Sequence, residues 1–166
     1  GGMNGWAFWT VAAGRGELRD AVVSAPGPGE MLVRSLASGI SRGTEALVFA
    51  GRVPVGEYPH MRAPLMAGDF PFPVKYGSAR VRRTEAGARA FVLHPHQEVF
   101  TAPAAMCMQV PDAVPTPRAV LAANMETALN IAWDAAALPG ERILVIGAGV
   151  VGLLAAWLLA RIPATR

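Results

Sequence analysis

Residues 143–152 carry the sequence Ile-Leu-Val-Ile-Gly-Ala-Gly-Val-Val-Gly, and this stretch decides the fold class of the chain. Its first four residues are all apolar, which is typical of a strand covered on both faces of a parallel sheet. The glycines that follow fit the pattern G-x-G-x-x-G, and the apolar run from about Val150 to Ala160 predicts a helix. A strand, a glycine turn and a helix in this order predict the opening of a Rossmann-type dinucleotide-binding domain.

Each part of the glycine loop has a physical role in holding a cofactor pyrophosphate. Gly147 permits the tight turn, Gly149 lets the backbone approach the phosphates, and Gly152 lets the helix pack closely on the strand. The start of the helix, with Val150 and Val151, offers free N–H groups and the positive end of the helix dipole. The alternative interpretation is a glycine-rich turn within an apolar helix hairpin.

The sequence divides into a β-rich domain, residues 1–117, and the beginning of an α/β domain, residues 118–166. The second part contains a linking helix, expected over residues 118–138, and then one strand and one helix. The acidic residue that binds the cofactor ribose is expected about 20 residues after the glycine loop, beyond Arg166. We therefore expect a truncated Rossmann domain that belongs to a longer protein, and either NAD or NADP as its cofactor.

Short apolar runs separated by glycine and proline predict strands and turns in the first domain. The expected strands cover residues 7–13, 18–23, 31–34, 90–93 and 98–101, and a helical turn is expected over residues 45–50. The fold class is thus a mixture of β and α/β structure.

Composition excludes several classes of protein. Of the 166 residues, 52% are hydrophobic and 16% charged, which excludes disorder as the main description. The single cysteine, Cys107, excludes an intramolecular disulfide and a zinc cluster built on cysteines, and it indicates a reducing, cytoplasmic setting. We expect no nucleic-acid partner, because the net charge is only +3 and the densest basic cluster is Arg80, Arg82 and Arg83. Residues 143–160 are interrupted by glycines and are not expected to span a membrane.

Both halves of the chain resemble the medium-chain dehydrogenase/reductase superfamily, in which a GroES-like catalytic domain precedes a Rossmann domain. The resemblance rests on Pro-Gly-Glu-Met-Leu-Val-Arg at 28–34, Gln-Val-Pro-Asp-Ala-Val at 109–114, Thr-Ala-Leu at 127–129 and Gly-Glu-Arg-Ile-Leu-Val-Ile-Gly-Ala-Gly at 140–149. Gly-Ile-Ser-Arg-Gly-Thr-Glu at 39–45 and Val-Lys-Tyr-Gly at 74–77 are similar to a zinc-binding alcohol dehydrogenase-like branch, which is related to bacteriochlorophyllide dehydrogenase.

The sequence departs from this family at its zinc ligands. The zinc enzymes carry a cysteine where this chain has Ser41, and Gly-His-Glu where it has Gly77-Ser78-Ala79. A hydroxyl and a methyl group cannot replace a thiolate and an imidazole, so we expect no catalytic zinc. Residues 78–89 are also shorter and more basic than the family pattern, and whether this stretch is authentic is left open.

The resemblance implies roles for four residues. Arg42 and Thr127 would contact the cofactor, Thr44 would relay a proton from the substrate hydroxyl, and Glu45 would orient its neighbours. Each has a simpler alternative: Arg42 as a solvated side chain, Thr44 as a helix cap, Glu45 as an acidic residue favoured in the first turn of a helix, and Thr127 as a helix-interior residue.

His94 and His96 flank Pro95 and would face the same side of an extended chain. Two histidines so placed could bind a metal or move protons, and without a defined third ligand we disfavour a metal site. The catalytic candidates are therefore Thr44, Glu45, His94 and His96.

These observations together predict a fragment of an NAD(P)-dependent oxidoreductase that transfers hydride between a nicotinamide and a small alcohol or carbonyl compound. The parent enzyme is expected to be a homodimer or homotetramer, and the fragment alone to be inactive. Two alternatives stay open. One is a zinc-free enone or quinone reductase, and the other is a non-catalytic nucleotide-binding module.

Overall fold

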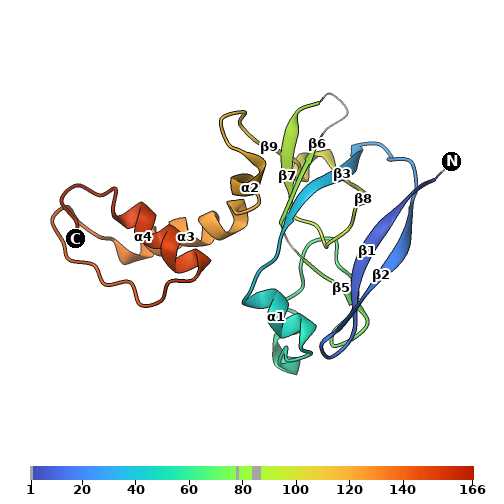
Figure 1. The fold of residues 1–166 in the computed structure, drawn as a ribbon, viewed down its shortest axis with the longest axis horizontal. Coiled ribbons are helices and arrows are strands. Elements are labelled where there is room, and N and C mark those ends of the chain that lie inside the picture. Colours follow the sequence, from blue (N-terminus) through green and yellow to red (C-terminus); the bar gives the residue numbers. More distant parts are fainter. Residues whose placement is uncertain (1, 78, 84–86) are drawn as a thin grey trace. The chain divides into compact units, whose positions relative to one another are not determined.

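The structure is a computed structural model that describes residues 2–77, 79–83 and 87–166. Part of the stretch whose authenticity is open, at residues 78 and 84–86, lies outside the described residues. The chain forms two compact units, one ending at Val120 and the other comprising Leu121–Arg166 (Figure 1). Each unit is described by itself.

The first unit is built from two antiparallel sheets. One sheet has the order β2-β1-β5-β4, and the other has the order β8-β3-β6-β7-β9. The strands are β1 (Met3–Ala12), β2 (Arg15–Val23), β3 (Glu30–Gly39), β4 (Ala67–Gly68), β5 (Val74–Lys75), β6 (Ala79–Arg83), β7 (Arg89–Val92), β8 (Val99–Pro103) and β9 (Met108–Gln109). Short helices lie between and after them: α1 (Thr44–Phe49), η1 (Val55–Glu57), η2 (Ala104–Met106) and α2 (Thr116–Ala119).

The five strands expected in the first domain are confirmed, and β1, β2 and β3 are each longer than expected. β3 continues to Gly39, whereas the apolar pattern ended at Arg34, because β8 pairs with its first half and β6 with its second half. The helical turn expected near residue 45 is α1. The extension of β3 carries Ser38 to the edge of the candidate site described below.

Two clusters of buried apolar side chains lie inside the first unit. Val33, Val92, Phe100 and Ala102 make one buried cluster. A second cluster, made by Val48, Val53, Phe70 and Val74, ties α1 to the chain around β5. Burial of this kind stabilises a domain by roughly 25 cal/mol per Å² of apolar surface removed from water.

The basic cluster seen in the sequence is largely internal. Arg80 and Arg82 are buried, and only Arg83 is exposed. Arg80 donates two hydrogen bonds to the carbonyl of Pro95, at 3.0 and 2.8 Å, and burial lowers its pKa to about 10. Within the described residues, the Nε and Nη1 atoms of Arg82 have no hydrogen-bond partner. Two of the three charges that suggested a basic surface therefore lie inside the fold.

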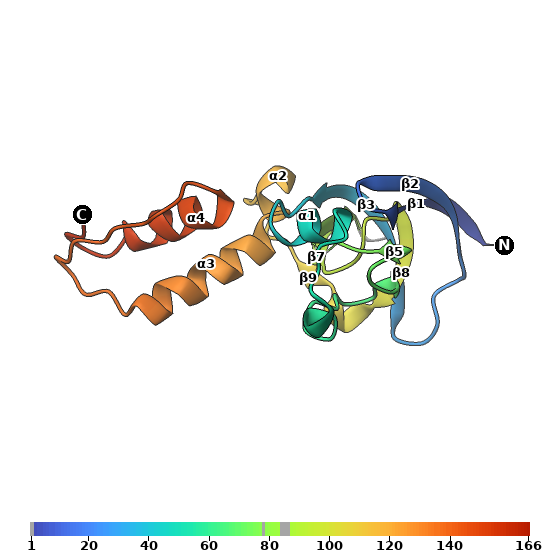
Figure 2. The ribbon, with the colours of Figure 1, turned by 90° about the horizontal axis from the view of Figure 1, so that it is seen from below.

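The second unit contains helices α3 (Ala122–Ala135) and α4 (Val150–Leu159), which pack side by side (Figure 2). The single helix expected over residues 118–138 is wrong. It is divided into α2 and α3, because Leu121 leaves the helical conformation at the boundary between the two units. Ala136, in the left-handed conformation at φ 46°, ends α3 before Pro139-Gly140.

The strand expected at residues 143–146 is also wrong. The segment belongs to no sheet, and Leu144 and Ile146 are 83% and 90% exposed. A strand needs neighbours for its N–H and C=O groups, and in the part of the chain that the structure describes no strand lies beside this one. Its beginning is anchored, where the Ile143 N–H donates to the Arg166 carbonyl at 2.7 Å.

We predict that Arg82→Met stabilises the protein by about 1–3 kcal/mol, because it removes a buried charge without hydrogen-bond partners at two of its nitrogens and keeps most of the side-chain volume. Urea unfolding of the 166-residue chain measures this free energy. Arg83→Met, on the same strand but exposed, is the matched control and should change stability by less than about 0.5 kcal/mol. A loss of stability in Arg82→Met that exceeds the control would contradict the prediction.

Candidate functional site

A pocket of about 530 Å³ opens in the first unit, next to α1. It receives residues from β1, from the turn after β3, from α1 and from the segment before β8. They are Phe8, Ile40, Ser41, Arg42, Glu45, Ala46, Phe49 and His96. The volume lies within the range of small-molecule sites, and the mixture of apolar walls with a few polar groups is typical of them.

The turn between β3 and α1 places Glu45 in this pocket. The Glu45 N–H donates to the Ser41 carbonyl at 3.1 Å, and the Ser41 N–H donates to Glu45 Oε2 at 2.5 Å. This reciprocal pair closes the turn and holds the carboxylate in place. A carboxylate in the first turn of a helix is also favoured by the positive end of the helix dipole.

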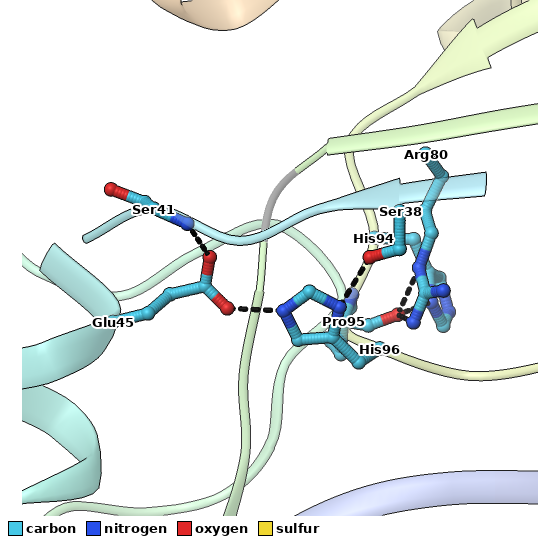
Figure 3. A network of polar contacts seen from close by, with 7 residues as sticks. All are labelled: Ser38, Ser41, Glu45, Arg80, His94, Pro95 and His96. Carbon is cyan, nitrogen blue, oxygen red and sulfur yellow. Dashed lines mark hydrogen bonds and ion pairs between the residues drawn. The ribbon is translucent and has the colours of Figure 1, made fainter. Parts of the chain in front are cut away.

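His96 is held on both sides of its ring (Figure 3). Nδ1 is hydrogen-bonded to the Ser38 hydroxyl, and Nε2 to Glu45 Oε1. The side chains of His96 and Glu45 are only 15% and 11% exposed. This shielding strengthens the electrostatic attraction between them relative to a pair in open water.

The backbone around His96 fixes where its ring lies. The His96 carbonyl accepts from the Phe8 N–H at 2.8 Å, and the His96 N–H donates to the Tyr76 carbonyl at 3.2 Å. Gly77 presses against the ring: a Cβ atom there would lie 2.7 Å from His96 Cδ2. Gly77 also has φ +137°, a conformation that residues with side chains rarely adopt, so glycine is required for two independent reasons.

His94 does not lie in the same environment as His96, contrary to the expectation that both face one side of an extended chain. Residues 93–98 belong neither to β7, which ends at Val92, nor to β8, which begins at Val99. Its ring stacks on Phe100 with centroids 3.5 Å apart, and its Nδ1 donates to the Pro95 carbonyl at 2.9 Å. Burial lowers its pKa to about 3, and the nearby Lys75 and Arg80 act in the same direction. His94 does not line the pocket, and it stays neutral near pH 7.

The other residues predicted from the sequence are divided between the two units. Arg42 lines the pocket and is exposed. Thr44, the first residue of α1, is exposed and is not among the lining residues. Thr127 lies on α3 in the second unit, where its hydroxyl donates to the Ala123 carbonyl at 3.2 Å, as a helix-interior threonine does. The structure thus brings Glu45, His96 and Arg42 together around one pocket.

The glycine loop in the second unit has the geometry that its sequence predicts. Gly147 has φ +108°, and a Cβ at Gly152 would lie 2.7 Å from the Gly147 carbonyl oxygen. Gly149 precedes the first helical residue of α4, and no atom lies within 4 Å of where its Cβ would be. The loop is therefore tight on its inner side and open at Gly149, where Val150 and Val151 begin the helix.

Sequence reasoning missed Ser38 and the apolar walls of the pocket. Ser38 stands within the Ser-Gly-Ile-Ser string that precedes α1, and it was overlooked because β3 was expected to end earlier. Phe8 and Phe49 look like ordinary core residues in the sequence. Their ring centroids lie 6.4 Å apart, and both line the pocket.

No family model matches this sequence, and no curated protein matches it either. Solved structures do match. The human synaptic vesicle membrane protein VAT-1 homolog-like protein aligns with 98% of this chain and 54% of its own, with TM-score 0.76 and 21% identity. The quinone oxidoreductase from Thermus thermophilus, also solved in complex with NADPH, aligns with 97% of this chain and 51% of its own, with TM-score 0.72 and 24% identity.

An alcohol dehydrogenase superfamily protein from Novosphingobium aromaticivorans gives a TM-score of 0.73 at 23% identity, with 97% of this chain and 52% of that chain covered. This chain therefore spans about half the length of the structures it matches. The likeness confirms the mixed β and α/β fold class and establishes the fold alone. Two of these three structures are a quinone oxidoreductase and an alcohol dehydrogenase superfamily protein.

Two further observations limit what the described residues can form. No helix among them is long and apolar enough to cross a membrane. Within the same residues, no group of three or more histidine, cysteine, aspartate or glutamate side chains is placed to hold a metal ion.

We predict that His94 makes the folded chain less stable in acid. Between about pH 3 and pH 6.5, its folded and unfolded pKa values, the unfolded chain binds a proton that the folded chain does not. The free energy of unfolding therefore falls as pH is lowered through this window, by up to about 1.4 kcal/mol per pH unit from this group. Above pH 6.5 His94 is neutral in both states, so it causes no loss of stability there.

His94→Phe keeps a ring against Phe100 and should reduce this slope, as measured by urea unfolding at several pH values. His60→Phe is the control, because His60 is exposed. Equal slopes in wild type and His94→Phe would show that His94 is not the group responsible.

Proposed function

We propose that the chain is the substrate-binding part of an NAD(P)-dependent oxidoreductase that transfers hydride between a nicotinamide and an alcohol or carbonyl carbon. The observation that carries this proposal is the pocket of the first unit, where the Glu45–His96 pair meets apolar walls. The glycine loop of the second unit supports it, because Gly149 leaves open space at the start of α4. The fold shared with quinone oxidoreductases and an alcohol dehydrogenase superfamily protein is consistent with it.

The apolar walls favour a substrate with an apolar body and one oxygen function. Phe8, Ile40, Ala46 and Phe49 would contact the body, and the carboxylate of Glu45 would contact the hydroxyl or carbonyl end. Removing apolar surface from water supplies most of the affinity in such pockets, and the few polar groups orient the ligand.

The residues present fit a dinucleotide. Its pyrophosphate would lie at the start of α4, where Gly149 leaves open space beside the first N–H groups of the helix. Arg42, which the sequence resemblance assigns to the cofactor, is exposed at the pocket of the first unit, and its planar guanidinium suits a phosphate or carboxylate. When bound, the nicotinamide supplies the chemistry of accepting or donating hydride.

The donor atoms do not fit a catalytic zinc. Ser41 offers a hydroxyl where the zinc enzymes carry a thiolate, and both ring nitrogens of His96 already have protein partners. A tetrahedral zinc site needs at least three such ligands, so we derive no step through a metal.

A zinc-free quinone or enone reductase is the second candidate, favoured by the likeness to quinone oxidoreductases. The two candidates are separated by assaying the full-length protein that contains these residues with secondary alcohols, ketones, enones and quinones, and with both NAD and NADP. Alcohol oxidation with an apolar preference supports the proposal. Activity on enones or quinones alone supports the second candidate, and no turnover supports a non-catalytic nucleotide-binding module.

Gly149→Val in the full-length protein should abolish detectable NAD(P) binding without unfolding it. The φ and ψ of Gly149, −75° and 176°, suit valine, and no protein atom obstructs the side chain, but a bound pyrophosphate would. Cofactor titration by fluorescence or calorimetry measures the loss. Gly56→Val is the matched control, since nothing lies within 4 Å of that position either. Unchanged affinity in Gly149→Val would show that the loop is only a structural turn.

The purified protein should hold no stoichiometric zinc, because the pocket lacks the thiolate and a free imidazole nitrogen. Elemental analysis after dialysis measures the content, and His60→Ala serves as a control for surface binding. About one zinc per chain that disappears in His96→Ala but persists in His60→Ala would contradict this prediction and place a metal at the pocket.

A cytoplasmic location and a homodimeric or homotetrameric parent remain predictions.

A further inference from the structure

We infer that Glu45 is the group that takes the proton of the substrate hydroxyl, and that His96 and Ser38 act on the reaction only by positioning its carboxylate. This inference rests on the proposed function and replaces the relay role that the sequence resemblance gives to Thr44. It assigns direct substrate contact to one residue of the network and a different task to the other two.

The ring of His96 has no hydrogen-bonding capacity to spare. An imidazole has two ring nitrogens, and those of His96 are bound to Ser38 and Glu45. A substrate oxygen could bond to this ring only by displacing one of these partners. His96 lines the pocket with its ring already committed, so it is a poor candidate for the group that meets the substrate.

Glu45, in contrast, keeps unused acceptor capacity. An ionised carboxylate has about four acceptor positions, and the contacts here use one on each oxygen, with His96 and with the Ser41 N–H. Glu45 lines the pocket and is still slightly exposed. It therefore retains acceptor positions for a hydroxyl in the pocket.

The direction of the hydrogen bonds follows from the carboxylate. A carboxylate oxygen can only accept, so His96 donates from Nε2 to Glu45 Oε1, and in that tautomer Nδ1 accepts from the Ser38 hydroxyl. The carboxylate thus selects the tautomer, and the Ser38 hydroxyl supports it and holds the ring in place. Pairing of Ser38 with Arg80 in the β3–β6 ladder holds the serine backbone in register.

The other predicted relay residue is poorly placed for this task. Thr44 is exposed at the start of α1, and it is absent from the residues that line the pocket. His94 is buried against Phe100, with its Nδ1 used by the Pro95 carbonyl. Of the four catalytic candidates from the sequence, Glu45 is the one with both access to the pocket and spare acceptor capacity.

In alcohol oxidation the substrate O–H bond breaks and its proton passes to the Glu45 carboxylate. The C–H bond breaks, its electron pair leaves as hydride for the oxidised nicotinamide, and the C=O double bond forms. The proton then passes from Glu45 to water, to which its side chain is partly exposed. In the reverse direction the protonated carboxyl of Glu45 donates to the carbonyl oxygen while hydride adds to the carbonyl carbon.

The test uses the full-length protein and the best alcohol substrate found in the panel. Glu45→Gln keeps an oxygen for the His96 N–H but cannot take a proton, so kcat should fall about 10²–10⁴-fold with little change in KM. The acidic limb of the kcat/KM pH profile should disappear in the same variant. Glu57→Gln, an exposed carboxylate beside His60, is the matched control and should keep both kcat and the limb.

Further variants separate positioning from general folding. Ser38→Ala should lower kcat by about tenfold, and Ser38→Thr, which keeps the hydroxyl, should restore it. His96→Ala should lower kcat more than His96→Gln, which keeps an N–H donor for Glu45. His60→Ala, at a surface histidine that also faces a glutamate, should have no effect. Thermal unfolding of each variant shows whether a loss of rate exceeds any loss of fold.

The outcomes separate this inference from the proposed function. If the wild-type protein transfers hydride with none of the substrates, the proposed function fails. If it is active and Glu45→Gln keeps its rate and its acidic limb, the proposed function stands and this inference is overturned. If Thr44→Val instead lowers kcat by the factor expected for Glu45→Gln while Glu45→Gln keeps its rate, the relay belongs to Thr44.

Discussion

The contact between Glu45 and His96 joins segments that are 51 residues apart in the sequence, and the pocket depends on it. Glu45 belongs to the short helix α1, which is too short to be stable by itself. His96 belongs to an irregular segment tied by its backbone to β1 and to the chain after β5. Their pairing holds these two pieces together at the surface of the first unit. It also places a carboxylate in a wall that is otherwise largely apolar.

Much of the first unit could be predicted from sequence, because strands and turns are set by local patterns of apolar, glycine and proline residues. That residues 143–146 form no strand among the described residues could not be predicted, because their four consecutive apolar side chains are typical of a buried strand. Such a run predicts burial on both faces, and burial requires neighbours that a local pattern cannot supply. The division of the helix after residue 116 depends in the same way on the boundary between units.

The candidate site shows the same limit at the level of single residues. Glu45 and Arg42 were found because they lie in one short motif, and the glycine loop because its spacing has a known mechanical purpose. The difference between His94 and His96 could not be found, because it depends on Phe100 for one ring and on Ser38 and Glu45 for the other. Ser38 carries no local signal that separates it from the other serines. Its importance comes from the length of β3, which is set by pairing with β6.

Gly77 has a consequence for how this protein can change. Its backbone, at φ +137°, disfavours any residue with a side chain. The nearest atoms to such a side chain would belong to the His96 ring. Any larger residue would push that ring, and with it the hydrogen bond to Glu45, so a change in the backbone segment would be felt in the pocket. Residue 77 therefore tolerates few substitutions, whereas the apolar walls of the pocket can change with less effect on the Glu45–His96 contact. The Phe8 and Phe49 side chains form part of those walls and take no part in the polar network.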